Sequence, residues 1–206
     1  MVTALKRKDV IRLSPPGFGA PLDDGFQATY LAYRDWLEEE LEGFDEPIDL
    51  VGHDWGGGHV MNVVMHRPEL VRSWASDAVG LFDADYVWHD LALVWQTPGE
   101  GEQLVNTMLG GTIGDRAAQM TALGIPLHIA TSIATAQGPE MGRAILSLYR
   151  SACQPAMVEA GRMLENAAAR PGLSLLATED PYVGSDELRR RAAGRAGAHT
   201  TRCSTS

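Results

Sequence analysis

The sequence predicts an α/β fold built on a mostly parallel sheet. Short apolar runs typical of strands alternate with segments whose apolar residues recur at helical spacing. A glycine-rich turn joins one of these strands directly to the helix that follows it. Between the third and fourth strands, a long stretch carries helical segments and no clear strand signal. We therefore expect a core formed by residues 1–80 and 170–206, interrupted by a helical insert at 81–169.

The composition is that of an ordinary globular protein. A chain of 206 residues fits one domain with a sizeable core, or one domain with a small insert. Its net charge of -10, without a basic stripe, argues against a nucleic-acid partner. The one cationic cluster, Arg189-Arg190-Arg191, stands beside acidic residues and predicts a solvated helix face.

The cysteine count and the start of the chain bear on its location. Cys153 and Cys203 make neither a disulfide framework nor a CxxC motif. The first eight residues lack the apolar core of a signal peptide, and no run approaches membrane-spanning length. These features predict a cytoplasmic protein without a membrane partner.

The elements follow from local pattern. The helix predicted first has apolar residues on one face and acids on the other, and Gly43 ends it. Ser185 is the expected N-cap of the last helix. In chain order, the predicted strands are Val10–Leu13, Ile48–Val51, Val71–Ser76, Leu173–Ala177 and His199–Arg202, and the predicted core helices are Phe26–Leu41, the segment from Asp54 to about Pro68, and Ser185–Ala193.

The turn between Ile48–Val51 and the next helix carries the strongest functional signal. Gly52 and Gly56 stand two positions on either side of Asp54, and small residues avoid a clash where helix and strand backbones meet. The apex carboxylate should be exposed, and the helix N-terminus favours its ionised form. The N–H of Trp55 lies where an oxyanion could be held.

An aspartate at such an apex suits attack on an sp3 carbon that bears a halide or an epoxide oxygen. The product is an alkyl ester, which water can hydrolyse at the aspartyl carbonyl, whereas serine would form an ether with no such exit. The alternative is that Asp54 serves only as a helix N-cap. His53 is expected to be a packed turn residue rather than a catalytic base.

The segment Gly52-His53-Asp54-Trp55-Gly56-Gly57 resembles the nucleophile elbow of α/β-hydrolase-fold epoxide hydrolases, and haloalkane dehalogenases carry a close relative of it. The resemblance covers roughly Val10 to Ala198 and implies an α/β-hydrolase core with an inserted helical cap. The weaker matching segments occur in the family's order: Pro16–Gly19, His66–Val71 and Thr178–Pro181.

The resemblance also implies roles for single residues. Asp54 would be the nucleophile, and Asp180 the acid that orients a histidine, although Asp180 can equally form an Asp-Pro turn. Tyr149 would donate a hydrogen bond to the epoxide oxygen, unless it is a plain core aromatic. Trp55 would bind halide in a dehalogenase, and since epoxide hydrolases share it, the choice stays open. The implied substrate is a small apolar epoxide or alkyl halide, with no cofactor and no metal.

Two departures from the family pattern matter. The family's first strands and its His-Gly-x-Pro loop have no sequence to occupy before Val10. The catalytic histidine is expected after the last strand, but His199 would stand at the start of that strand. We therefore expect a chain that lacks both ends, whose ester would accumulate for want of a base. The alternative is a non-catalytic remnant that binds a small apolar ligand. The remaining histidines lie on the elbow helix, at its end or in the insert: His59, His66, His89 and His128.

Overall fold

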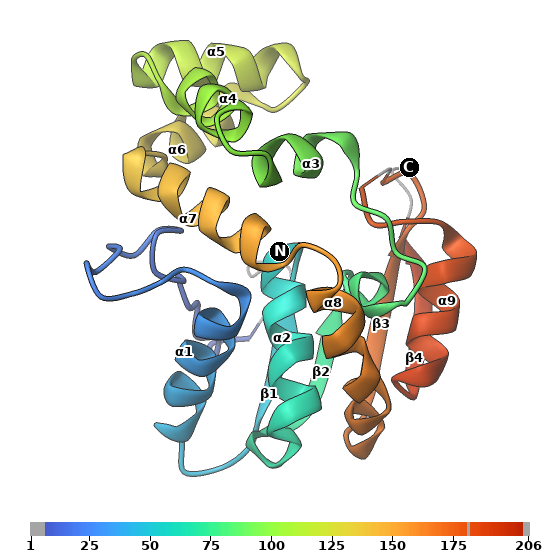
Figure 1. Ribbon diagram of the computed structural model, residues 1–206. Helices are drawn as coiled ribbons and strands as arrows, with labels where there is room; N and C mark the ends of the chain where they lie inside the picture. Colours follow the sequence, from blue (N-terminus) through green and yellow to red (C-terminus); the bar gives the residue numbers. More distant parts are fainter. Residues whose placement is uncertain (1–6, 181, 204–206) are drawn as a thin grey trace.

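A four-stranded parallel sheet forms the layer against which the core helices pack (Figure 1). The computed structural model describes residues 7–180 and 182–203. The strands follow one another across the sheet in chain order, which confirms four of the five predicted strands and the α/β class. They are β1 (Ile48–Gly52), β2 (Val71–Ser76), β3 (Gly172–Ala177) and β4 (Ala198–Cys203).

The predicted strand Val10–Leu13 is wrong. This segment is extended but pairs with no strand among the described residues, and Ile11 is 64% exposed. A cavity of about 940 Å³ lies between this segment and β1 and is lined by residues of both, so the two backbones do not come together. A strand needs a hydrogen-bonded neighbour, so apolar pattern alone does not make one.

Three helices pack around the sheet layer. Figure 1 shows α2 (Trp55–His66) lying across β1 and β2, with α1 (Tyr30–Glu42) beside it and α9 (Asp186–Arg195) next to β4. Residues 57–65 of α2 are all buried, as expected for a helix covered on every side.

The N-cap residues show where two of the predicted helices begin. The first helix begins at Tyr30 rather than Phe26, because Thr29 caps it: its Oγ1 accepts the N–H of Ala32 at 3.1 Å. Ser185 caps α9 as predicted, with its Oγ 3.2 Å from the N of Leu188.

The segment between β2 and β3 is helical throughout its described length, as predicted. In Figure 1, α3 to α7 lie above the carboxyl ends of the strands, whereas α8 and the 3-10 helix after it descend beside α2. There the Asn166 amide donates to the carbonyl of Met65 at 3.2 Å. The helices are α3 (Asp90–Gln96), α4 (Glu100–Leu109), α5 (Ile113–Ala122), α6 (Leu127–Ala136), α7 (Pro139–Ser151) and α8 (Ala156–Ala160), with 3-10 turns at Pro68–Leu70, Val79–Phe82 and Gly161–Ala169.

The arginine cluster of α9 is the predicted solvated face at Arg190 and Arg191, which are exposed, but not at Arg189. Arg189 is 3% exposed, and its guanidinium donates to the carbonyl of Ala177 at 2.7 Å and to Asp186 at 2.6 Å. Arg191 pairs with the buried carboxylate of Asp83. Arg189 thus ties α9 to the end of β3, and Arg191 ties it to the segment after β2, which charge pattern alone could not reveal.

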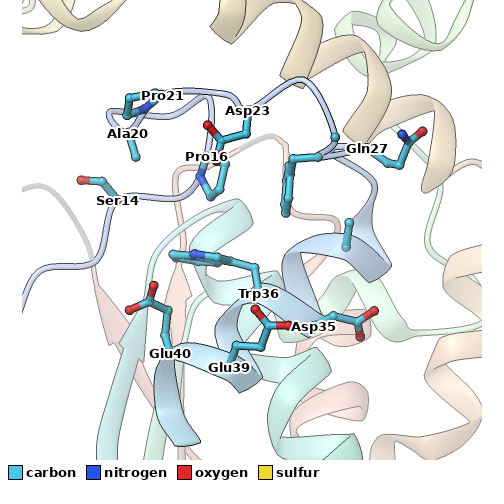
Figure 2. Close-up of a pocket in the computed structure, with 13 residues that line it drawn as sticks. Ser14, Pro16, Ala20, Pro21, Asp23, Gln27, Asp35, Trp36, Glu39 and Glu40 are labelled. Atoms are coloured by element: carbon cyan, nitrogen blue, oxygen red, sulfur yellow. The ribbon is translucent and has the colours of Figure 1, made fainter. Parts of the chain in front are cut away.

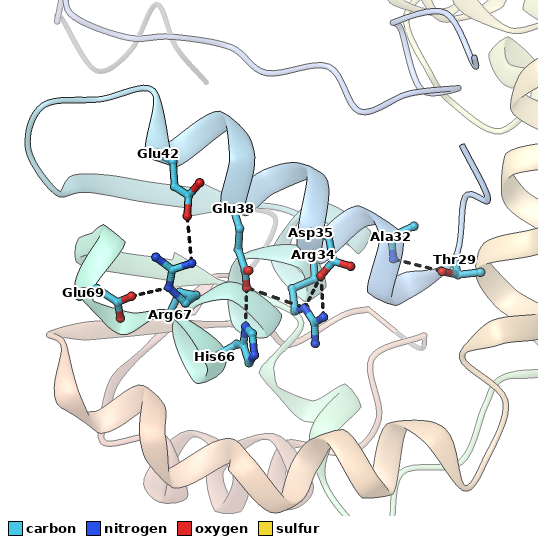
Figure 3. Close-up of polar contacts among 9 residues, drawn as sticks. All are labelled: Thr29, Ala32, Arg34, Asp35, Glu38, Glu42, His66, Arg67 and Glu69. Carbon is cyan, nitrogen blue, oxygen red and sulfur yellow. Dashed lines mark hydrogen bonds and ion pairs between the residues drawn. The ribbon is translucent and has the colours of Figure 1, made fainter. Parts of the chain in front are cut away.

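A polar contact joins α1 to the end of α2 (Figure 3). Glu38 is 9% exposed, and its carboxylate lies 2.8 Å from Nδ1 of His66 and 3.8 Å from Nε of Arg34. Arg67 bonds Glu42 one turn further on, at 3.0 Å. A carboxylate in this position is satisfied by partners from both helices, so it links them.

Replacing Glu38 by alanine should lower the free energy of unfolding by about 1–3 kcal/mol, because the substitution removes the carboxylate that pairs with both His66 and Arg34. Urea unfolding at pH 7 measures this. The control is Glu39→Ala, one position on and exposed, which should change the free energy by no more than about 0.5 kcal/mol. Equal effects of the two substitutions would contradict the linking role of Glu38.

Candidate active site

Asp54 stands at the sharp turn between β1 and α2. Its backbone has φ 54° and ψ -129°, in the left-handed half of conformational space that residues other than glycine rarely occupy. Such a conformation costs on the order of 1–3 kcal/mol. Although the residue occupies the N-cap position, its side chain makes no capping hydrogen bond. The N-cap interpretation is therefore wrong, and the carboxylate is left for another use.

The flanking glycines are not equivalent. A Cβ on Gly52 would lie 2.2 Å from the carbonyl oxygen of Gly56, so β1 and α2 touch here backbone to backbone. A Cβ on Gly56 would meet no atom within 4 Å. Only Gly52 is required by the close approach, and the sequence-based expectation that both glycines are required is wrong for Gly56.

A second carboxylate, which sequence reasoning missed, supports the turn. Asp77 directly follows β2, and its Oδ1 accepts the backbone N–H of Asp54 at 2.9 Å. Its Oδ2 contacts Nδ1 of His53. Burial acts to raise the pKa of Asp77, but the bonds from His53 and Asp54 outweigh it and hold the pKa below its usual value. The sequence did contain a signal for Asp77 as a site residue. It directly follows a predicted strand, and the carboxyl ends of neighbouring parallel strands meet at one edge of the sheet.

His53 is not the packed residue that the sequence suggested. Its side chain is 75% exposed, and its one described polar contact is the Nδ1–Asp77 pair. This pairing raises the pKa of His53 above its usual value, and the charges of Asp54 and Asp180 act in the same direction. A histidine oriented by a carboxylate thus stands next to the apex residue.

The charge on Asp54 is tuned by its surroundings. Burial is the main cause that raises its pKa, and the nearby charges of Asp77 and Asp180 add to it. His53 and the N–H of Trp55 act in the opposite direction without cancelling the rise. The N–H of Trp55 thus acts as expected at a helix N-terminus, but burial of the carboxyl group is the larger cause of the shift, while the residue as a whole is exposed as predicted.

Aromatic side chains from the insert close over the elbow. The rings of Trp55 and Tyr149 meet edge to face with centroids 5.4 Å apart, and Tyr149 also packs on Trp88 at 5.5 Å and on Trp95 at 4.6 Å. Burial and the charge of Asp54 raise the pKa of the Tyr149 phenol, while a hydrogen bond with Trp55 acts against them. Tyr149 is thus buried, as the core-aromatic alternative required, yet it lies within electrostatic reach of Asp54.

Asp180 lies in the loop after β3. Its Oδ1 accepts the N–H of Tyr182 at 2.8 Å, which is the turn-forming use of such a residue. Its charge nevertheless reaches Asp54 and His53, whose pKa values it helps to raise, and His89, whose pKa burial lowers against the effect of Asp180. The four sequence-predicted site residues, Asp54, Trp55, Tyr149 and Asp180, therefore gather at one end of the sheet.

The other described histidines have different roles. His59 is 3% exposed and stacked on Tyr33, and burial lowers its pKa to about 3. His89 caps α3, its Nδ1 accepting the N–H of Ala92 at 3.1 Å. His199 pairs with Leu173 near the start of β4, away from the carboxyl ends of the strands. None of these three contacts the Asp54 turn from a position that the family pattern would give its base.

Two cavities lie near the first part of the chain, and one of them reaches the elbow. One of about 640 Å³ lies against α1, where Figure 2 shows Trp36 with the acidic side chains of Asp35, Glu39 and Glu40. The second, of about 940 Å³, runs along the free edge of β1 and reaches His53. Neither lining includes Asp54, which is an exposed residue.

Two kinds of feature are absent from the described residues: a cluster of metal ligands and a helix that could span a membrane. No group of three histidine, cysteine or acidic side chains in 7–180 and 182–203 is placed to hold a metal ion. Among the same residues, no helix has the length and apolar character to cross a membrane.

Sheet topology, the strained aspartate elbow and the helices above the strand ends define an α/β hydrolase. The chain belongs to the Alpha/beta hydrolase family, whose sequence model matches residues 2–204. No curated protein sequence matches the chain.

Solved structures show the same fold. Haloalkane dehalogenase DbeA from Bradyrhizobium elkani is 18% identical with a TM-score of 0.65, covering 93% of this chain and 71% of its own. The ancestral haloalkane dehalogenase AncHLD2 is 22% identical with a TM-score of 0.62, at 93% and 72% coverage. E-2-(acetamidomethylene)succinate hydrolase is 14% identical with a TM-score of 0.62, at 90% and 69% coverage. At these identities the likeness concerns the fold alone.

Replacing Gly52 by alanine should destabilise the protein by at least about 3 kcal/mol, since the new Cβ would overlap backbone atoms that cannot move independently of α2. Urea unfolding followed by far-UV circular dichroism measures the loss. Gly56→Ala is the matched control: it enters open space on a helix and should be neutral or stabilising by up to about 1 kcal/mol. A tolerated Gly52→Ala would contradict the backbone contact.

Proposed function

We propose that this protein is a hydrolase that works through an ester on Asp54. The observation that carries the proposal is the strained turn, which presents a carboxylate without any capping bond beneath a set of aromatic rings. Residues with about 1–3 kcal/mol of backbone strain cluster at functional sites. Here the strained residue would be a nucleophile held in a fixed position.

The first step is attack by a carboxylate oxygen of Asp54 on an sp3 carbon, with the leaving group departing on the opposite side. Tyr149 packs on Trp55 and lies close enough to Asp54 for the charge of that carboxylate to act on its phenol. The aromatic rings offer an apolar surface on which a substrate carbon can lie next to Asp54. The second step is hydrolysis of the aspartyl ester at its carbonyl carbon, for which the N–H of Trp55 is a candidate oxyanion donor.

An epoxide is the substrate class that this site suits best. Epoxide opening develops an alkoxide, which needs a proton or a hydrogen bond as the C–O bond breaks. Tyr149 is a buried phenol that lies next to Trp55 and within electrostatic reach of Asp54, so it can supply this hydrogen bond. The aromatic surroundings favour a small apolar molecule.

An alkyl halide is the second candidate. Its support is a pair of indole groups near Tyr149: Trp55, beside the nucleophile, and Trp95, whose Nε1 is buried without a hydrogen-bond partner among the described atoms. Indole N–H groups can stabilise a departing halide, which needs no proton. The dehalogenase neighbours are consistent with this class, although they share only the fold.

In this proposal the helices above the strand ends act as the cap over the substrate, and Asp180 is a nearby charge that can orient a base or stabilise its charged form. The free thiols Cys153 and Cys203 suit a reducing cytoplasm. A ligand-binding protein without turnover is the alternative from a different class.

Incubation with a small epoxide or haloalkane should alkylate Asp54, and intact mass spectrometry should detect the adduct. When enzyme exceeds substrate in ¹⁸O-water, the label should enter Asp54 and not the product alcohol, because water attacks the aspartyl carbonyl. Peptide mapping locates the label.

Asp54→Ala should form neither adduct nor product, whereas Asp49→Ala, at an exposed position of β1, should behave as the wild type. Label found only in the product, or activity retained in Asp54→Ala, would contradict the ester mechanism. A folded wild-type chain that binds these compounds without any adduct would support the ligand-binding alternative.

Tyr149→Phe should separate the two substrate classes. Loss of the phenol should slow adduct formation from an epoxide by about 10²-fold or more, because the opening oxygen loses its donor, and should change that from a haloalkane by only a few fold. Rapid-quench mass spectrometry measures both rates. Tyr86→Phe is the control, since that hydroxyl already donates to the carbonyl of Tyr182 at 3.0 Å. Equal losses with both substrates would contradict a proton-donor role for Tyr149.

A further inference from the structure

The elbow carries an aspartate–histidine pair besides its apex carboxylate. Oδ1 of Asp77 is bound to the backbone N–H of Asp54, and Oδ2 of the same carboxylate contacts Nδ1 of His53. One carboxylate therefore fixes both the turn that holds Asp54 and the imidazole ring beside it. The pair follows from the sheet register. Gly52 of β1 lies opposite Ser76 of β2, and the residues that come next in the chain are His53 and Asp77.

The contact defines the tautomer of the histidine. A carboxylate only accepts hydrogen bonds, so Nδ1 of His53 carries the proton and Nε2 has a free lone pair. The side chain is 75% exposed, so Nε2 is open to water. The same arrangement, a carboxylate on one nitrogen and a free second nitrogen, defines general bases in hydrolases.

Water has access to this side of the turn. The cavity of about 940 Å³ along the free edge of β1 is lined by His53, Gly52 and Gly56, with polar groups at its far end. The aromatic rings lie on the insert side of the elbow, where they cover Trp55. Water can thus reach His53 from this cavity, next in sequence to the residue that would carry the ester.

We propose that His53, held by Asp77, is the general base that hydrolyses the Asp54 ester. The inference rests on the proposed ester mechanism and adds to it a base carried by the elbow itself rather than by β4. His199, the one histidine of that strand, stands near its beginning. His53 instead adjoins the ester in sequence and is oriented by a second residue.

The step balances without any further reactant. Nε2 of His53 takes a proton from water as the water oxygen bonds to the ester carbonyl carbon of Asp54. The tetrahedral intermediate then breaks its bond to the alkyl oxygen, which takes the proton from Nε2 and leaves as the alcohol. The carboxyl group of Asp54 and the neutral His53 are regenerated, and the carboxyl proton passes to solvent.

The charged groups facing His53 are Asp77 from the end of β2, Asp54 from the elbow and Asp180 from the loop after β3. All three stabilise the imidazolium in the free protein, and Asp77 and Asp180 still do so in the ester intermediate, where Asp54 is neutral. Since only neutral histidine can act as the base, the hydrolysis step should accelerate as pH rises, with a midpoint above the usual histidine value of about 6.5.

The test is single-turnover mass spectrometry of His53→Gln with the substrate that alkylates the wild type. Adduct formation should keep its wild-type rate within a few fold, whereas adduct decay should slow by about 10²- to 10⁴-fold and lose its dependence on pH. His66→Gln is the matched control: its Nδ1 also contacts a carboxylate, Glu38, but at the other end of α2. It should decay as the wild type does.

Asp77→Asn gives a second measurement. Asparagine can still accept the N–H of Asp54 but would donate to Nδ1 of His53, which moves the ring proton to Nε2 and removes the basic lone pair. Adduct should again accumulate, and Asp77→Glu should restore part of the decay rate.

The outcomes separate the two proposals. A wild type that forms no adduct overturns the ester mechanism. A wild type whose adduct forms but never decays, or a His53→Gln adduct that decays at the wild-type rate, overturns only the role of His53. A folded His53→Gln that loses adduct formation as well would assign the residue to the turn and not to base catalysis.

Discussion

The backbone contact between Gly52 and Gly56 is the constraint on which the site depends. It brings β1 and the start of α2 so close that no side chain fits at Gly52. The chain must then reverse within the intervening residues, and Asp54 takes a φ of 54°. The hydrogen bond from Asp54 to Asp77 offsets part of that strain. Packing, not the chemistry of the carboxylate, therefore fixes where the nucleophile candidate stands.

The same geometry explains the electrostatics. Three carboxylates, Asp54, Asp77 and Asp180, lie at the carboxyl end of the sheet. His53 lies beside them and carries a positive charge when it is protonated. Burial raises the pKa of Asp54, whereas two hydrogen bonds lower that of Asp77. Two neighbouring acids are thus driven in opposite directions, which is the condition for giving them different tasks.

Local pattern predicted the elements well because each depends on its own residues. Short runs typical of strands identified β1 to β3, the predicted strand His199–Arg202 lies within β4, and the elbow motif located Asp54. What failed depends on distant partners. Val10–Leu13 has the composition of a strand but no neighbour to pair with, and Arg189 is buried because Ala177 and Asp186 receive its guanidinium. Neither partner is visible from the segment itself.

The His53–Asp77 pair illustrates the boundary between the two kinds of information. The residues are 24 positions apart, and nothing in either segment indicates the other. Once β1 and β2 are known to be parallel neighbours with Gly52 opposite Ser76, the residues after both strands must meet. The pair is then a property of two adjacent strands and one tight turn, the most rigid part of the fold. Asp180, by contrast, owes its position to a loop, where its side chain already serves the turn through Tyr182. A base carried on the elbow moves with the nucleophile, so its aim does not depend on how any loop above the sheet is arranged.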